Sequence, residues 1–457
     1  MKQVQTKYGR PPGPFKGPVW YPMALLSACY LLANVDRNVF GLLVEPIKAA
    51  FKMSDAQVGF VQGTAFSIFV LLGALPLSRL ADRGNRPTII GLCTLAWSVA
   101  TSACGFATSQ LGLLAARAVV AAGEGGLPPA AISFFPDIYR GQAVVRANAA
   151  FLFAIYIGGG LALLFGGTLY ADAQHWRLAG TPLAALAPWQ LVFVVIGLPG
   201  LLLGPLAWLT LREPPDRTRP LKPYGLVDTM KYMIRRPAFL GPYIAAACAS
   251  TLLAATNLAW TPAMLMRNFK LHEQQVGLVY GPVYMIAGLL GAALAAALGG
   301  KSSASDELRL QQLLKLFLIE SLLLAVPSIL APLATDETVA LALLAASIFL
   351  YAGMLVLLAS VGQIVYPAGM RAQASTIASV LNGLVGAGAG PLLVGLVSDA
   401  LPPGPRSLAS AIAIVTAIIA PLIILSVYGM ERVARRNPEL ALPPSTAYAT
   451  NELRTVP

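Results

Sequence analysis

The chain carries twelve long apolar segments, and these restrict its fold more than any other feature of the sequence. A helix needs about 20 apolar residues to cross the hydrocarbon core of a bilayer. Segments of that length occupy residues 20–44, 56–80, 88–108, 110–133, 144–170 and 189–211, and then 238–266, 275–299, 310–333, 337–364, 372–396 and 407–429. Only 11% of the residues are charged, against about 25% in soluble proteins. The sequence therefore predicts an all-α membrane protein with twelve transmembrane helices in two six-helix halves.

Lysine and arginine are unevenly distributed among the loops, which predicts the orientation of the helices. Both tails, the even-numbered loops and the central linker are basic, whereas acids such as Asp172, Asp336 and Asp399 lie in odd-numbered loops. Because basic loops stay in the cytoplasm, both termini are expected there. The predicted parts are an amino-terminal tail (1–18), a first half (19–211), a cytoplasmic linker (212–237), a second half (238–430) and a carboxy-terminal tail (431–457).

The second part of the linker, Tyr224 to Arg236, has an amphipathic pattern. Its apolar side chains share one helical face, whereas Asp228, Lys231 and Arg235 point away from it. The apolar residues are Leu226, Val227, Met230, Met233 and Ile234. This pattern predicts a helix at the membrane surface with its basic side toward anionic headgroups. An ordinary solvated connector is the alternative.

The charged residues that lie deep inside the apolar segments, away from their ends, are Asp36, Arg37, Arg117, Glu124 and Glu320. Each costs roughly 2.5–3.5 kcal/mol at a helix centre, so the protein must offset that cost. At about 1.5 Å per residue, Asp36 lies roughly 24 Å up the core, at about the depth of Arg117. Glu124 follows Arg117 by seven residues and shares its helix face. We therefore expect the first four to form one buried network, whereas Glu320 has no evident partner.

The charged network has two possible interpretations. Burial favours the protonated form of a carboxylic acid and a nearby guanidinium favours the ionised form, so relative movement would switch a proton on or off. In this first interpretation, Asp36 and Glu124 couple transport to protons, and Arg37 and Arg117 act as counter-charges or bind an anionic headgroup. The alternative is a static ion pair that holds the first and fourth helices together.

Glycines recur at equivalent places in the two halves. The fifth segment contains Gly158 to Gly160 with Gly166 and Gly167, and the eleventh contains Gly386 to Pro391 with Gly395. Small residues let helices cross closely. Their paired placement indicates a parallel six-plus-six repeat, an arrangement that many secondary transporters use.

The second loop, Ser78 to Pro87, reads S-R-L-A-D-R-G-N-R-P. It resembles the G-x-x-x-D-R-x-G-R-R signature of the major facilitator superfamily. The matching residues are Asp82, Arg83 and Arg86. The resemblance implies that they latch the two halves together on the cytoplasmic side in the outward-open state.

Further motifs narrow the resemblance: N-V-D-R-N-V-F around Asp36, the D-R-G-N-R loop form, R-A-V-V-A-A-G-E-G-G from Arg117, and G-A-G-P-L-L-V-G-L-V-S-D in the eleventh segment. Together they resemble the Spinster family of lipid transporters. This implies proton-coupled or facilitated movement of lysophospholipids or sphingoid-type lipids by a protein of the bacterial inner membrane. The same D-R pair also occurs in organic-anion symporters of the superfamily.

Polar and aromatic residues within the second half are candidates for lining a central cavity. They are Asn257, Trp260, Tyr280, Tyr284, Tyr351, Gln363 and Asn382. The scarcity of charge in this half suits an amphipathic substrate, because apolar pockets with few polar groups bind such ligands.

We predict a secondary active transporter that works by alternating access, acts as a monomer and moves an amphipathic lipid together with protons. One alternative is a symporter or exporter of small organic anions or amphipathic drugs, and another is a non-transporting receptor or scaffold. We expect no enzyme activity, cofactor or metal site, since no nucleophile–base pair, metal cluster or phosphate loop is evident. The net charge of +12 does not indicate nucleic-acid binding, because the basic residues lie between apolar segments.

Overall fold

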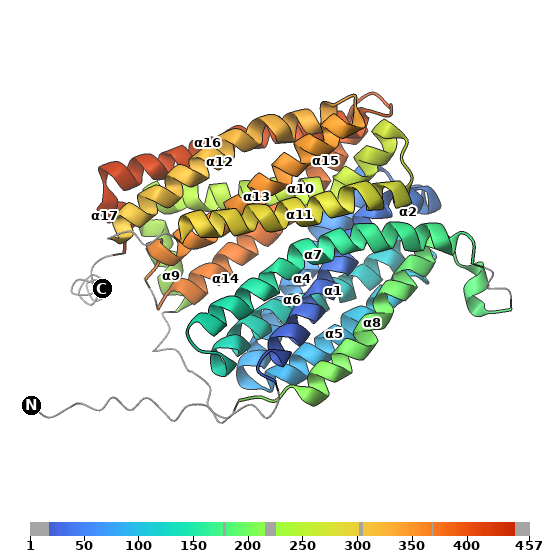
Figure 1. Ribbon diagram of the computed structural model, residues 1–457, viewed down its shortest axis with the longest axis horizontal. Coiled ribbons are helices and arrows are strands. Elements are labelled where there is room, and N and C mark those ends of the chain that lie inside the picture. Colours follow the sequence, from blue (N-terminus) through green and yellow to red (C-terminus); the bar gives the residue numbers. More distant parts are fainter. Residues whose placement is uncertain (1–17, 177–179, 215–224, 301–304, 368, 444–457) are drawn as a thin grey trace, which may run out of the picture.

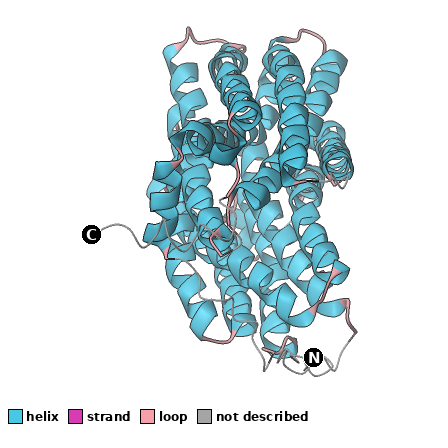
Figure 2. Ribbon diagram, turned by 90° about the vertical axis from the view of Figure 1, so that its left-hand side faces the viewer, coloured by secondary structure: helices cyan, strands magenta, loops and turns pink. Residues whose placement is uncertain are grey.

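The structure, a computed structural model, describes residues 18–176, 180–214, 225–300, 305–367 and 369–443, which form helices and loops without a strand (Figure 2). The first half contains α1 (Tyr21–Leu42), α2 (Val44–Phe51), α3 (Asp55–Gly59), the π-helical turn η1 (Phe60–Ala65), α4 (Phe66–Arg83), α5 (Arg86–Cys104), α6 (Gln110–Ile138), α7 (Gln142–Ala173), the short 3-10 turn η2 (Pro182–Ala185) and α8 (Pro188–Thr210). The rest contains α9 (Leu226–Arg235), α10 (Pro237–Phe269), α11 (Glu273–Gly299), α12 (Asp306–Leu333), α13 (Glu337–Val365), α14 (Arg371–Leu381), the π-helical turn η3 (Asn382–Gly388), α15 (Ala389–Ala400), α16 (Ser407–Arg436) and α17 (Pro438–Ala441).

Helix occupies each of the predicted apolar segments. In the described ranges, eleven helical segments are long and apolar enough to cross a membrane, and α3, η1 and most of α4 form one of them, from Asp55 to Ala81. Helix α1, which carries Asp36 and Arg37, is not among the eleven. Polar caps fix several helix starts, since Ser109, Ser305 and Asp336 each accept a hydrogen bond from a backbone N–H three residues later. Such caps satisfy N–H groups that the helix itself leaves free.

The helices form two bundles, which lie one above the other in Figure 1. In the first bundle α5 packs on α6 and α8, and α1 packs on α7; in the second, α13 packs on α11 and α12, and α16 on α10 and α12. The bundles meet where α7 contacts α11 and where α3 and η1 contact η3 and α15.

Glycines allow the two bundles to approach each other closely along this seam. A side chain on Gly160 would collide with Gly281 and Met285, and one on Gly63 would collide with Gly388. The two π-helical turns meet here, and the Thr64 hydroxyl donates a hydrogen bond to the Gly388 carbonyl at 2.8 Å. The glycine-rich stretches noted in the sequence thus provide contacts between the two bundles.

Candidate functional site

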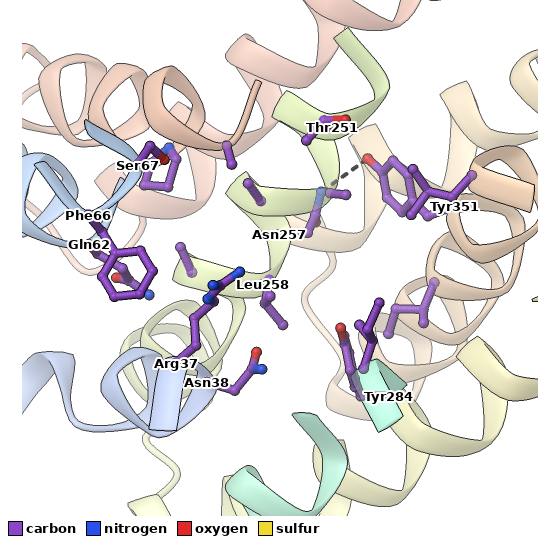
Figure 3. A pocket seen from close by; sticks show the side chains of 18 of the residues that line it. Arg37, Asn38, Gln62, Phe66, Ser67, Thr251, Asn257, Leu258, Tyr284 and Tyr351 are labelled. Atoms are coloured by element: carbon purple, nitrogen blue, oxygen red, sulfur yellow. Dashed lines mark hydrogen bonds between the residues drawn. The ribbon is translucent and has the colours of Figure 1, made fainter. Parts of the chain in front are cut away.

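A cavity of about 380 Å³ lies between the two bundles. Side chains from α1, η1, α4 and α7 line one side of it, and α10, α11, α13 and the η3–α15 segment line the other. Figure 3 shows Arg37 and Asn38 facing Asn257, Tyr284 and Tyr351 across this space. The lining is mostly aliphatic and aromatic, and Arg37 is its charged residue within the described ranges.

The four embedded charges, Asp36 and Arg37 of α1 and Arg117 and Glu124 of α6, form two ion pairs beside the cavity. Arg37 donates a hydrogen bond from Nη2 to Glu124 Oε2 at 2.7 Å. Asp36 accepts a hydrogen bond from the Thr101 hydroxyl at 2.6 Å and a longer one, 3.4 Å, from Arg117 Nη1. Neighbouring residues of α1 thus pair with residues two helical turns apart on α6, which share one face of that helix.

The two ion pairs differ in their access to the cavity. The Arg37 side chain is 45% exposed and lines the cavity, whereas Asp36, Arg117 and Glu124 are buried. A ligand in the cavity can therefore reach Arg37 directly, and the Asp36–Arg117 pair lies behind it.

Two aromatic rings hold the guanidinium groups in place. The Arg117 guanidinium carbon lies 4.6 Å from the centre of the Phe66 ring and 4.9 Å from that of Phe40, and the Arg37 carbon lies 5.0 Å from the Phe66 ring. Such cation–π contacts are worth about 2 kcal/mol or more where water is excluded. Phe66 therefore links the exposed guanidinium to the buried one.

The network retains unused hydrogen-bonding capacity. Arg117 Nε and Nη2 and Glu124 Oε1 are buried and have no hydrogen-bond partner among the described residues. With two carboxylates and two guanidiniums the cluster is neutral when all four are ionised, and it gains one positive charge with each bound proton. It is chemically suited to exchange a proton or an anionic group.

The second half contributes some of the residues that the sequence suggested. Tyr280, Tyr284 and Tyr351 line the cavity, as does Asn257, whose Nδ2 donates a hydrogen bond to the Tyr351 hydroxyl at 3.1 Å. The Tyr280 hydroxyl is buried without a hydrogen-bond partner in the described structure.

Three of the suggested residues do not line this cavity. Trp260 is fully buried and donates from Nε1 to the Pro391 carbonyl at 2.9 Å, so it joins α10 to α15. Asn382 accepts a weak hydrogen bond from the Cys248 thiol at 3.5 Å. Gln363 is exposed near the end of α13. The sequence identified polar and aromatic residues in apolar helices, but it did not show which face each of them occupies.

A second charged cluster joins the two bundles at the end of the seam where Asp55 lies. The sequence did not indicate this cluster. Arg267 at the end of α10 donates from Nη1 and Nη2 to the two carboxylate oxygens of Asp55 at 2.7 and 2.8 Å, and from Nε to Glu45 at 2.8 Å. Lys48 and the Ser398 hydroxyl also bind the Asp55 carboxylate. We call Glu45, Lys48, Asp55, Arg267, Ser398 and Asp399 the gate cluster.

Asp399 adds a cap across the seam. Its carboxylate oxygens accept hydrogen bonds from the backbone N–H groups of Asp55 and Ala56 at 3.1 and 2.9 Å. These are the first residues of α3, so a carboxylate from the second bundle stabilises the start of a helix in the first, where the helix dipole is positive. The signal available in the sequence was the acidic character of the odd-numbered loops.

Arg86, part of the signature loop between α4 and α5, binds within the first half. It contacts Asp137 at 2.5 Å, donates from Nε to Glu213 at 2.8 Å and from Nη1 to the Ser133 carbonyl at 2.7 Å, and lies over the Phe134 ring. These contacts tie the start of α5 to the ends of α6 and α8 rather than to the second bundle. The side chains of Asp82 and Arg83 lie outside what the structure describes.

Glu320 on α12 lies apart from both clusters. Its carboxylate packs over Gly353 of α13, and its buried Oε2 has no hydrogen-bond partner in the described structure. Within the described ranges, no group of three or more His, Cys, Asp and Glu side chains is arranged to hold a metal ion.

Comparison with known proteins assigns this architecture to a family. The sequence model of the Major Facilitator Superfamily matches residues 26–391. An MFS-type efflux pump of Mycolicibacterium smegmatis is 28% identical over 404 residues, which cover 87% of this chain and 88% of the pump. Protein spinster homolog 1 of Xenopus laevis is 26% identical over 402 residues, which cover 82% of this chain and 72% of that protein.

A solved structure supports the same assignment. The crystal structure of a bacterial homologue of the human lysosomal transporter Spinster, in an inward-facing and unoccupied conformation, superposes with a TM-score of 0.77. It is 25% identical in sequence and covers 94% of this chain and all of its own. The resemblance to Spinster proteins noted in the sequence is thereby confirmed.

Proposed function

The chain belongs to the major facilitator superfamily, and from this premise we propose that it is a twelve-helix secondary transporter that moves an amphipathic lipid by alternating access, with both termini in the cytoplasm. Helix α1 supplies the twelfth span. The cost of its two charges is offset because both are paired with residues of α6. Members of this superfamily are transporters rather than enzymes, and no cofactor is needed for such a cycle.

The proposed state is open to the cytoplasm. The gate cluster and the contacts of α3 and η1 with η3 and α15 join the bundles at the end where Asp55 lies. By the distribution of basic loops that end is extracellular. The similar Spinster homologue was solved in an inward-facing state, and this supports the same conformation for the present chain.

The observation that carries the substrate proposal is the uneven polarity of the cavity. Arg37 offers a cation at one side, and Tyr284, Tyr351 and aliphatic side chains form the rest of the wall (Figure 3). A lysolipid or sphingoid-type lipid with an anionic headgroup matches both parts, since the headgroup binds Arg37 and the start of the chain contacts the apolar wall.

Proton coupling follows from competition for Arg37. When an anionic headgroup binds this guanidinium, Glu124 loses the partner that favours its ionised form and takes up a proton in its apolar surroundings. The pair behind it, Asp36 and Arg117, responds through Phe66 and through the shared helix α6. Arg117 thus acts as a counter-charge, and Arg37 as both counter-charge and headgroup ligand.

The signature loop acts in the state of the transport cycle in which the cytoplasmic side is closed. We propose that Asp82, Arg83 and Arg86 latch the two halves when the cytoplasmic side closes. Arg86 is held within the first half in this structure, so in the proposed cycle closure of the cytoplasmic side requires new contacts there.

Uptake by the purified protein in liposomes tests this function, with a fluorescent lysolipid and an imposed pH gradient. Asp36→Asn and Glu124→Gln should each abolish the stimulation by the gradient. Glu320→Gln makes the same chemical change away from the cavity and should retain it. Full pH dependence in both cluster variants would leave the static ion pair as the role of these residues.

The same assay separates the alternatives. If a soluble organic anion or an amphipathic drug moves and the lysolipid neither moves nor competes, the protein is a symporter or exporter of such compounds. Similarity to an efflux pump makes drugs the first compounds to test. Failure to move any of these substrates would favour a receptor or scaffold.

A further inference from the structure

Helix α9 exposes an apolar strip that the bundle leaves uncovered. Leu226, Val227, Met230 and Ile234 are all exposed, with 63% of Val227 and 72% of Ile234 accessible. At 100° per residue these four side chains fall within about 100° of the helix circumference. A strip of this kind on a charged helix is typical of segments that lie in the membrane interface.

The side of α9 that lies beyond Leu226 is fixed to the protein. Thr229 and Met233 are buried, and the Tyr232 hydroxyl donates a hydrogen bond to the Val365 carbonyl at 3.0 Å. The Tyr232 ring also contacts the Tyr366 ring, with 6.1 Å between centroids. The sequence placed Met233 on the same face as the exposed residues, and it does lie about 20° from Leu226 around the helix, but the structure buries it against the protein at the edge of that face.

The position of α9 matches that of a bilayer surface. It ends at Arg235, and the membrane-spanning helix α10 begins at Pro237 after a single residue. Figure 1 shows α9 beside the ends of the long helices, at the end of the molecule opposite α2. The exposed strip thus lies beside the start of α10, at one end of the long helices (Figure 1).

The charges beside the strip indicate what covers it. Lys231 and Arg235 are exposed and flank the apolar strip, on the side of the helix that lies beyond Val227. Arg236 is already engaged, since it stacks on Tyr232 and donates to the Leu442 carbonyl. Apolar side chains beside free cations match the acyl region and the phosphates of an anionic phospholipid surface. The amino-terminal tail is a poor alternative because its Lys2, Lys7, Arg10 and Lys16 carry the same charge.

We propose that α9 binds the surface of the cytoplasmic leaflet, inserting Leu226, Val227, Met230 and Ile234 among the lipids and pairing Lys231 and Arg235 with anionic headgroups. The choice of leaflet rests on the proposed orientation. Because Tyr232 fixes α9 to the end of α13, this contact connects the charge of the membrane surface to the second bundle.

Spin labels measure this contact in the full-length protein. Ile234→Cys and Asp228→Cys are made in a background whose four native cysteines, all buried, are replaced by alanine. The labelled protein is placed in nanodiscs of phosphatidylcholine with or without phosphatidylglycerol. The Ile234 label should be relaxed by oxygen, which concentrates in lipid, and the Asp228 label by a water-soluble nickel chelate. Equal accessibility of both labels to the chelate would overturn the proposal, as would dipolar broadening that reveals a second copy on the strip.

Charge variants test the anionic component. Lys231→Gln with Arg235→Gln should lower the ratio of the lipid-inserted to the free state of the Ile234 label about thirtyfold in phosphatidylglycerol nanodiscs at low salt, and little in phosphatidylcholine. Arg432→Gln with Arg436→Gln removes the same charge from the end of α16 and should leave the label unchanged. Equal effects of the two pairs would refute specific docking by α9. Uptake by the labelled variants is measured separately, so the loss of docking and the loss of transport are distinguished.

Discussion

Arg267 should control how tightly the gate cluster holds the two bundles together. The two terminal nitrogens of its guanidinium donate to both carboxylate oxygens of Asp55, and its Nε donates to Glu45. The side chains of Arg267 and Asp55 are 15% and 4% exposed. In Arg267→Gln, the Asp55 carboxylate loses its bidentate partner, but only while the gate is closed, because water solvates the carboxylate once the gate opens.

The size of the effect follows from this burial. Removing one partner of a buried ion pair costs about 3–5 kcal/mol. Lys48 remains beside Asp55, and Glu45 is about a third exposed, so a smaller cost of about 2–3 kcal/mol is expected here. At about 1.4 kcal/mol per factor of ten, the closed gate should lose about 30- to 150-fold in its equilibrium with the open state.

Distances between the bundles at this end measure that shift. Spin labels at Thr108→Cys and Thr335→Cys report on exposed loops of the first and second half, in the cysteine-free background. Electron–electron double resonance should show a longer-distance population in Arg267→Gln, and a smaller one in Arg267→Lys, which keeps the charge but not the fork. Arg406→Gln makes the same substitution at an exposed site nearby and serves as control. An unchanged distance distribution in Arg267→Gln would refute a gating role for this cluster.

Three further predictions concern packing. Phe66→Ala should destabilise the protein by about 3–5 kcal/mol, the usual cost of truncating a buried Phe, with Phe60→Ala at an exposed position as the thermal-unfolding control; equal melting temperatures would contradict the role of the ring in holding both guanidiniums. Gly63→Ala should slow lysolipid uptake because its β-carbon would lie 2.7 Å from the Gly388 carbonyl oxygen, whereas Gly241→Ala meets open space; equal uptake would mean that the seam tolerates the methyl group. Glu320→Leu should stabilise the protein by about 1–3 kcal/mol, since it removes a buried, unpartnered carboxylate oxygen; a lower melting temperature would indicate a partner for Glu320.

The sequence predicted the helical architecture because hydrocarbon imposes a strict length and polarity on each span. It also indicated the grouping of Asp36, Arg37, Arg117 and Glu124, since the rise per residue gives depth directly and few embedded charges compete as partners. The individual pairs were not determined. Depth alone associated Asp36 with Arg117, but the pairing of Arg37 with Glu124 depends on how α1 is rotated against α6.

The gate cluster was harder to find for a different reason. Glu45, Lys48 and Asp55 stand near helix ends, where a charge costs little and ordinarily faces water. Their contact with Arg267 joins positions more than two hundred residues apart, and no local pattern encodes it. Trp260 shows the same limit: its residue type suits a cavity, but rotation of α10 turns it toward Pro391.

The π-helical turn η1 has a consequence for the register of its helix. A π turn contains about one residue more than the α-helical turn that it replaces, so every side chain after it is rotated by about 100° relative to an uninterrupted helix. Phe66 is the first residue after η1, and its ring touches both Arg37 and Arg117. Deleting one residue from Phe60–Ala65 would therefore turn this ring away from both guanidiniums while leaving every charge in the protein in place. The cation–π contacts of both guanidiniums thus depend on a single inserted residue in a neutral segment that carries none of the network's charges.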